Sequence, residues 1–206
     1  AGEIPGRGHA GGAERVSRRV EIRTARLLIR ELRLDDAPAF IDMASDGSLG
    51  DIFGDCRDCH RWMGRWIEEA RALCAADDPQ RDYLAYAIET LEDHTVIGSV
   101  GSTYYEDVRQ VGVTYFLGAA FRGRGYMAEA LLAFTAYFLR TYPVGLLCAA
   151  ARVDNAASWK TLEKAGFVRT ETKLYRDLYD EEEKWYHFYR LNSNPAVGKG
   201  GTPSDF

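Results

Sequence analysis

The stretch FRGRGYMAEALLAF, residues 121–134, places two arginines and two glycines in four consecutive positions directly before an apolar helical pattern. The start of a helix offers unpaired N–H groups and a partial positive charge, and both favour a bound anion. Glycines at such a start let the backbone approach a ligand closely. The stretch therefore predicts an anion-binding loop that opens a helix.

The composition is that of an ordinary folded protein. The 206 residues are 46% hydrophobic and 28% charged, and 26 basic against 31 acidic residues give a net charge of −5. This size predicts one domain, over residues 21–192, with flexible tails at 1–20 and 193–206. The acidic balance argues against nucleic acid as the main partner, because gripping phosphates needs a basic face. No apolar run reaches about 18 residues and no signal-peptide pattern appears, so we expect a cytoplasmic protein without a membrane partner.

A C-x-x-C-H pattern begins at Cys56 and matches the motif of covalent haem attachment. A second interpretation places Cys59 and Cys74 on the apolar stripe of an amphipathic helix over 57–75. A zinc site would need two further ligands at workable spacing, and Cys74 and Cys148 do not form a second pair. We expect buried free thiols in a reduced compartment, with neither haem nor metal.

The remaining pattern predicts an α/β fold with a mixed sheet. A three-strand meander is followed by strand, helix, strand and helix, an order typical of mixed sheets. The wholly apolar GLLCAAA, residues 145–151, predicts a buried strand. Strands are expected at 26–34, 83–89, 95–105, 111–117, 145–151, 167–175 and 185–191, and helices at 35–43, 57–75, 125–140 and after an N-cap at Asp154 or Asn155.

A dinucleotide site is the obvious competitor for the glycine loop. Gly123 and Gly125, followed by Ala128, fit the looser G-x-G-x-x-A form of that fingerprint. The dinucleotide fold wants the motif after its first strand, with an acidic residue about 20 positions further on. Here the preceding strand is the third of a meander, and residues 138–142 occupy the place of the acid. The context argues against a dinucleotide.

Four motifs instead resemble the GNAT N-acetyltransferases, in that family's order, across about residues 24–191. The loop resembles the acyl-CoA motif R/Q-x-x-G-x-G/A, with Arg122, Gly125 and Met127 in its defining positions. The resemblance implies a mostly antiparallel sheet, splayed between VTYFL and GLLCAAA and flanked by helices. The segments RTARLLIREL, YAIETLEDHTVIGSVG, GYMAEAL and ARVDNAASWKTLEKAGF resemble the ribosomal-protein alanine/serine acetyltransferase-like branch (RimJ/RimL-type).

The resemblance implies acetyl-CoA as cosubstrate and assigns residues to it. Pantetheine would pair with the strand at Phe116 and Leu117 and accept a hydrogen bond from Asn155. Ser158 would help to protonate the leaving thiolate. Asn155 as a plain N-cap and Ser158 as a plain small residue are the alternatives. The pyrophosphate would lie on the backbone N–H groups of Arg122, Gly123, Arg124, Gly125, Tyr126 and Met127.

Two departures from the family pattern bear on this assignment. Met127 stands where the loop usually ends in a small residue, which affects how closely the backbone nears a phosphate. The strand pattern E-I-G-Y reads Gly-Val-Thr-Tyr at 112–115, so a frequent candidate acid is missing. A base must then come from elsewhere, and we select Glu89 ahead of Glu106 and Asp107. A solvated glutamate at a strand end is the alternative for Glu89.

The resemblance implies an N-acetyltransferase in which an amine attacks the thioester directly in a ternary complex. A protein N-terminus, an amino acid, a polyamine-like metabolite and an antibiotic are all compatible acceptors. The acidic run 180–183 predicts either attraction of a cationic acceptor or a solvated loop. A homodimer is common for this resemblance. The alternative function is a catalytically inactive CoA-binding or interaction module on the same fold.

Overall fold

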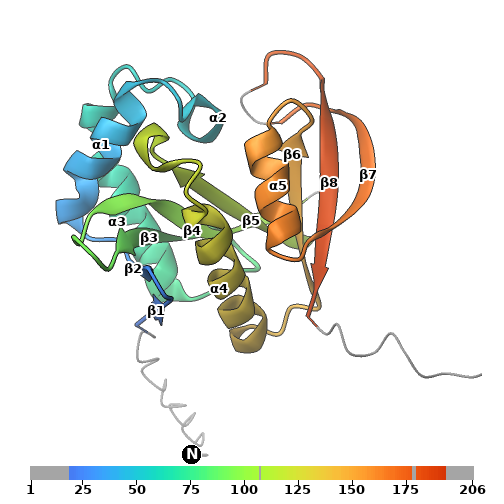
Figure 1. Ribbon diagram of the computed structural model, residues 1–206, viewed down its shortest axis with the longest axis horizontal. Helices are drawn as coiled ribbons and strands as arrows, with labels where there is room; N and C mark the ends of the chain where they lie inside the picture. The colour runs from blue at the N-terminus through green and yellow to red at the C-terminus, as the bar shows by residue number, and fades with distance from the viewer. Residues whose placement is uncertain (1–18, 107, 178–179, 194–206) are drawn as a thin grey trace, which may run out of the picture.

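The computed structural model describes residues 19–106, 108–177 and 180–193. Nearly all of both predicted tails, and the candidate base Asp107, lie outside the described residues. Within them one eight-stranded sheet passes through the molecule and helices cover both of its faces (Figure 1). No helix in this part of the chain is both long and apolar enough to cross a membrane.

The sheet has the order β1-β2-β3-β4-β5-β6-β8-β7. Every neighbouring pair is antiparallel except β5 and β6, which run parallel. The predicted mixed, mostly antiparallel sheet is confirmed. The strands are β1 (Glu21–Arg23), β2 (Leu27–Glu31), β3 (Leu84–Thr90), β4 (Val96–Tyr105), β5 (Gln110–Leu117), β6 (Leu146–Arg152), β7 (Val168–Tyr175) and β8 (Lys184–Asn192).

The helices follow the predicted order, with one addition, α2. Neither α2 nor β1 was predicted, because segments of four and three residues are too short to show a period. The helices are α1 (Ala37–Ser45), α2 (Gly50–Phe53), α3 (Cys59–Ala76), α4 (Tyr126–Thr141) and α5 (Ala156–Lys164), with 3₁₀ turns η1 (Leu34–Asp36) and η2 (Ala119–Phe121).

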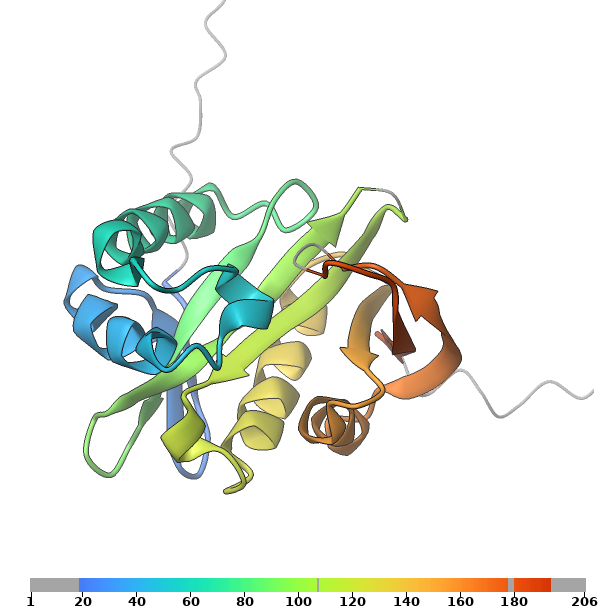
Figure 2. The same ribbon diagram turned by 90° about the horizontal axis from the view of Figure 1, so that it is seen from above.

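Strand β3 is buried at all seven positions because both faces of the sheet are covered. Its larger side chains, Tyr86 and Ile88, pack in the cluster that α4 completes. Its small side chains, Ala85 and Ala87, pack in a second cluster with α1 and α3. Figure 2 shows α1 and α3 on one side of the sheet and α4 on the other. The two clusters hold the sheet rigid from both sides.

The sheet splays between β5 and β6. These strands share the single paired position Gly112–Cys148. A Cβ on Gly112 would lie 2.4 Å from the ring of Tyr105 and 3.2 Å from the carbonyl oxygen of Cys148, so a larger residue does not fit at this junction. Beyond it the strands separate, as the view in Figure 2 shows. The predicted splay between VTYFL and GLLCAAA is confirmed.

Helix α3 turns an apolar stripe toward the sheet. Cys59, Met63, Ile67 and Ala70 are its buried residues, at the spacing of one helical face. The thiol of Cys59 lies 3.8 Å from the carbonyl oxygen of Ile41. The prediction that Cys59 lies on a buried helix face is confirmed. Cys74 is only partly buried and packs against the core cluster that α4 completes.

Candidate active site

The loop at residues 122–125 joins η2 to the first turn of α4. Gly123 and Gly125 both have φ of +77°, a left-handed conformation that favours glycine. Within the described residues, the N–H groups of Gly123, Arg124 and Gly125 donate to no backbone carbonyl. Successive N–H groups in such a conformation form a concave donor site, and the start of α4 adds its partial positive charge. The geometry suits a bound anion.

Arg122 takes no part in this row of donors. Its N–H group donates to the carbonyl oxygen of Ala119 at 3.3 Å. Its guanidinium donates to the carbonyl oxygen of Leu117 at 3.1 Å and to the hydroxyl of Ser48 at 3.0 Å. Arg122 therefore ties the end of β5 to the segment before α2, which is a positioning role rather than the predicted contact with phosphate.

Met127 does not obstruct the loop. Its side chain is buried, with 7% exposed, and belongs to the core cluster beneath α4. The side chain therefore points into the protein, while the backbone of the first helical turn remains on the loop side. The neighbouring Tyr126 ring lies under the guanidinium of Arg26, 4.5 Å from its centroid. The departure from a small residue is absorbed by the core.

Arg26 fixes the loop from the start of β2, a role that the sequence did not predict. It donates to the carbonyl oxygen of Arg124 at 3.0 Å and forms an ion pair with Glu129 at 2.7 Å. Thr24 donates to the same carboxylate at 2.6 Å. Burial alone would raise the pKa of Glu129, but the hydrogen bonds from Thr24 and Arg26 lower it. Glu129 therefore stays ionised, and the positive charge of Arg26 balances it beside the loop.

A cavity of about 700 Å³ opens at the splay. It brings together three predicted site residues, Phe116 from β5 and Asn155 and Ser158 from the start of α5. Leu117 lies outside this lining, and its carbonyl oxygen is occupied by Arg122. On the side of the splay, the lining residues include Thr114, Tyr115 and Phe116 of β5, Ala150, Ala151 and Arg152 of β6, and Asn155 and Ser158 at the start of α5.

Asn155 is the N-cap of α5. Its side-chain oxygen accepts a hydrogen bond from the N–H of Ser158 at 3.1 Å, which satisfies one of the free donors of the helix start. The capping interpretation is confirmed. The residue also lines the cavity, so its amide nitrogen can donate to a ligand there while its oxygen caps the helix.

The hydroxyls of Ser158 and Tyr115 lie 2.9 Å apart, and the Tyr115 hydroxyl is also 3.3 Å from the Ser158 carbonyl oxygen. If tyrosine donates to the serine hydroxyl, the serine proton is free to face the cavity. If tyrosine donates to the carbonyl, the serine hydroxyl can donate back to tyrosine. Burial raises the pKa of Tyr115 to about 12, so it stays protonated at neutral pH. Tyr115 was not among the site residues that the sequence predicted.

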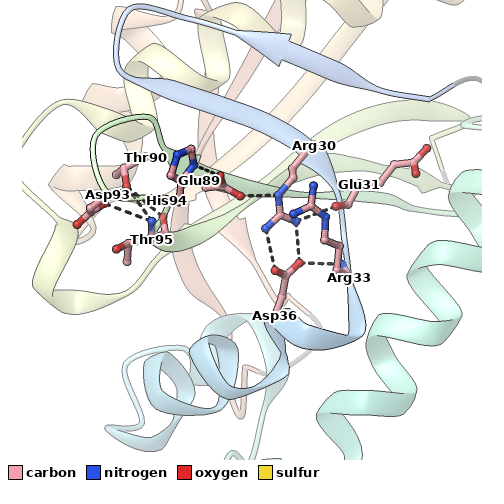
Figure 3. A network of polar contacts seen from close by, with 9 residues as sticks. All are labelled: Arg30, Glu31, Arg33, Asp36, Glu89, Thr90, Asp93, His94 and Thr95. Carbon is pink, nitrogen blue, oxygen red and sulfur yellow. Dashed lines mark hydrogen bonds and ion pairs between the residues drawn. The ribbon is translucent and has the colours of Figure 1, made fainter.

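Glu89 is separated from this cavity. It is 6% exposed and accepts a hydrogen bond from Arg30 at 2.6 Å, while His94 lies 2.8 Å from its other oxygen (Figure 3). Arg30 also forms two hydrogen bonds to Asp36, at 2.8 and 2.9 Å. Burial opposes ionisation of Glu89, but the bonds from His94 and Arg30 outweigh it and lower its pKa. Glu89 is neither solvated nor placed beside Ser158.

The acidic run begins with a buried residue. The Asp180 carboxylate accepts hydrogen bonds from Lys184 at 2.7 Å, Tyr186 at 2.6 Å and the N–H of Asp177 at 3.1 Å. Burial opposes its ionisation, but these bonds lower its pKa to about 2. Asp180 therefore holds the β7–β8 connection together, and residues 181–183 are exposed.

An aromatic wall completes the cavity on the side of α2 and α3. The Phe53 ring packs edge-to-face against Trp66 at 5.1 Å and against Phe116 at 5.2 Å. Trp62 and Tyr83 also line the cavity. The sequence assigned the tryptophans to a helix but gave no sign that they border the site, because α2 was not predicted and it is α2 that brings Phe53 to them.

The family model for the acetyltransferase (GNAT) domain matches residues 26–168 of this chain. This protein belongs to the GNAT acetyltransferase family. It is an enzyme that uses acetyl-CoA as its cosubstrate, as the sequence predicted. No curated protein matches the sequence of this acetyltransferase.

Solved structures share the fold of this acetyltransferase at low identity. The RimL ribosomal L7/L12 alpha-N-protein acetyltransferase in complex with CoA has a TM-score of 0.71 and 15% identity, over 84% of this chain and 98% of that one. An acetyltransferase from Salmonella typhimurium that modifies the N-terminal serine of L7/L12 has a TM-score of 0.68 and 16% identity, over 84% of this chain and 99% of that one. The microcin C7 self-immunity acetyltransferase MccE, in complex with acetyl-CoA and AMP, has a TM-score of 0.67 and 15% identity, over 82% of this chain and 93% of that one. At these identities the likeness shows the shared fold alone.

Proposed function

We propose that this acetyltransferase moves the acetyl group of acetyl-CoA to a primary amine by direct attack in a ternary complex. The observation that carries the proposal is the cavity at the splay, where Tyr115, Asn155 and Ser158 converge. This arrangement has room for two substrates at the edge of β5, and it presents hydroxyl groups where a thiolate would leave.

The cosubstrate would bind mainly through backbone groups. Its pyrophosphate lies on the N–H groups of residues 123–127, with Arg26 supporting the loop from below. Pantetheine pairs with the edge of β5 beyond Gly112, in the manner of an added strand, and takes a hydrogen bond from Asn155. A backbone N–H of β5 then polarises the thioester carbonyl.

The chemistry requires two proton movements. The neutral amine forms the new C–N bond as the C–S bond breaks, and the thiolate takes a proton from Ser158. Tyr115 gives its proton to the serine alkoxide in turn, and the resulting phenolate takes a proton from solvent. The proton lost by the amine passes to water in the cavity, and no role is assigned to Glu89, which lies elsewhere. Much of the acceleration comes from holding both substrates in line.

The acceptor is a primary amine, either of a small molecule or of a protein N-terminus. A protein N-terminus is supported by the Salmonella relative that modifies the N-terminal serine of L7/L12. A small molecule is supported by the volume of the cavity, about 700 Å³, and by the aromatic side chains on one of its walls. A cytoplasmic location, a homodimer and a single domain over 21–192 stay predictions.

The test is a calorimetric titration of acetyl-CoA into the wild type and Gly125→Asp. We expect binding in the wild type and a loss of at least about 100-fold in the variant, because aspartate adds a like charge and strains the left-handed position. Gly166→Ala is the matched control, since Gly166 has φ of +90° but follows α5. It should bind acetyl-CoA normally.

An assay of CoA release with mixed primary amines completes the test. Release that is faster with protein than without it supports the enzyme. Binding of acetyl-CoA with no acceleration for any amine would instead indicate the inactive CoA-binding module. Absence of binding to the wild type would overturn the proposal.

A further inference from the structure

One face of α3 borders the cavity and continues beyond it. Trp62, Trp66 and Glu69 lie at positions i, i+4 and i+7, so their side chains share that face. All three line the cavity at the splay, and all three also line a more open hollow of about 680 Å³ that only α3 residues form within the described chain. The face Trp62–Trp66–Glu69, here called the α3 face, therefore runs from the cavity toward solvent.

The two indole rings of the α3 face are held in place by phenylalanines. Phe53 contacts Trp62 at 5.5 Å and Trp66 at 5.1 Å between ring centroids, and Phe40 contacts Trp66 at 5.6 Å. Both tryptophans stay half-buried, so part of each ring is open. A preformed, partly dehydrated indole surface attracts an organic cation through the negative face of the ring.

The charge of the cavity has the matching sign. Five carboxylates and one arginine line the cavity. Arg57 and Lys184 lie outside the lining but pair with two of these carboxylates. When both are counted, five negative and three positive charges leave the cavity a net charge of −2. Within the described residues, no ion pair neutralises Glu69. The charged lining residues are Asp51, Asp55, Glu69, Asp177, Asp180 and Arg152.

Tyr83 lies beside Glu69 on the cavity wall. Its hydroxyl is buried, and burial first, and then the negative charge of Glu69, raise its pKa above the ordinary value. The hydroxyl therefore stays protonated beside Glu69, and the negative charge of that carboxylate remains available to a bound cation.

We propose that the α3 face binds a second positive charge of the acceptor, so that the acceptor is a small organic dication such as an aliphatic diamine. The inference rests on the proposed function. One amine loses its proton and attacks the thioester near Ser158, while the other stays charged between the indoles and Glu69. The volume of about 700 Å³ is in the range of small-molecule sites.

The experiment compares 1,5-diaminopentane with n-pentylamine, which has the same chain and one charge fewer. With saturating acetyl-CoA at fixed pH, we expect kcat/KM for the diamine to exceed that for the monoamine by about tenfold in the wild type. Glu69→Gln should raise KM for the diamine about tenfold and change KM for the monoamine much less. Trp66→Leu, which also alters the cavity wall, should weaken both amines but the diamine more strongly. Glu92→Gln, which removes a charge at the β3–β4 turn outside the cavity, should change neither.

Equal kcat/KM for the two amines in the wild type, or variants that weaken both amines equally, would overturn the proposal. A lysine-rich peptide acetylated at its N-terminus far more efficiently than the diamine would overturn the small-molecule occupant. If no amine is acetylated although acetyl-CoA binds, the proposed function has failed instead. Quenching of tryptophan fluorescence by 1,5-diaminopentane then tests whether the α3 face binds the diamine. Binding to the wild type that is lost in Glu69→Gln would still support the site, and no binding to the wild type would overturn it.

Discussion

Polar side chains at the two ends of the β3–β4 hairpin differ in their surroundings. Those at the turn bond one another, and those at the other end line the cavity. At the turn, Glu89 accepts from Arg30, and Arg30 also pairs with Asp36, so the buried charges satisfy one another (Figure 3). At the other end, Tyr83 and Thr103 line the cavity at the splay. Polar groups that satisfy one another stabilise a fold, whereas those that face a cavity are available to a substrate.

The strongest way to break this comparison is Arg30→Met, which leaves Glu89 and Asp36 buried without their cation. We expect the free energy of unfolding to fall by about 3–5 kcal/mol. Chemical denaturation measures this, with the exposed Arg23→Met as control, for which little change is expected. A loss below about 1 kcal/mol would show that the network does not stabilise the fold.

Removing a hydroxyl at the cavity should lower activity and leave stability almost unchanged. Ser158→Ala should lower kcat about 100-fold and leave the free energy of unfolding within about 0.5 kcal/mol. Tyr115→Phe should lower kcat about tenfold. The double variant should be no slower than Ser158→Ala alone, because both hydroxyls act in one relay. Effects that multiply in steady-state assays would mean that the two hydroxyls act separately.

Glu89→Gln sharpens the comparison, because it asks whether the turn network has any part in catalysis. We expect kcat to stay within about threefold and the free energy of unfolding to fall by about 1–2 kcal/mol. The folded pKa of Glu89 lies below its ordinary value of 4.5, so its stabilisation is complete above that pH and is lost as pH falls through the folded value. Denaturation curves between about pH 3 and pH 7 should therefore converge for the two proteins at the acid end. A fall in kcat of about 100-fold without loss of stability would make Glu89 catalytic.

The smallest effect is expected at the rim of the same network. The His94 side chain is 75% exposed, although it contacts Glu89 at 2.8 Å. His94→Gln should change the free energy of unfolding by less than about 0.5 kcal/mol, because water replaces an exposed partner at little cost. A loss above about 1 kcal/mol in thermal or chemical denaturation would show that the histidine is part of the buried network.

The sequence predicted the helices other than α2, the strands other than β1 and the glycine loop, because their signals are local. Gly123 and Gly125 stand next to the helix that they open, and Asn155 is three residues from the N–H that it caps. The splay between VTYFL and GLLCAAA is not a local signal, and it was expected only from the resemblance to the GNAT family over about residues 24–191.

The polar partnerships of the site are not local, and there the prediction stopped. Arg30 and Glu89 are 59 residues apart, and Arg26 and Arg124 are 98 apart. A glutamate at a strand end looks the same in sequence whether an arginine neutralises it or a cavity exposes it. The aromatic wall was missed for the same reason, since Phe53 meets Trp66 only in the folded chain.

The single paired position Gly112–Cys148 also has a mechanical meaning. It makes the sheet two panels, β1–β5 and β6–β8–β7, that meet at one hinge point within the described chain. A cosubstrate that lies along the gap would contact both panels where their strands no longer pair with each other. Bound cosubstrate should therefore stabilise the enzyme by adding contacts between the panels to those of the core cluster that they already share.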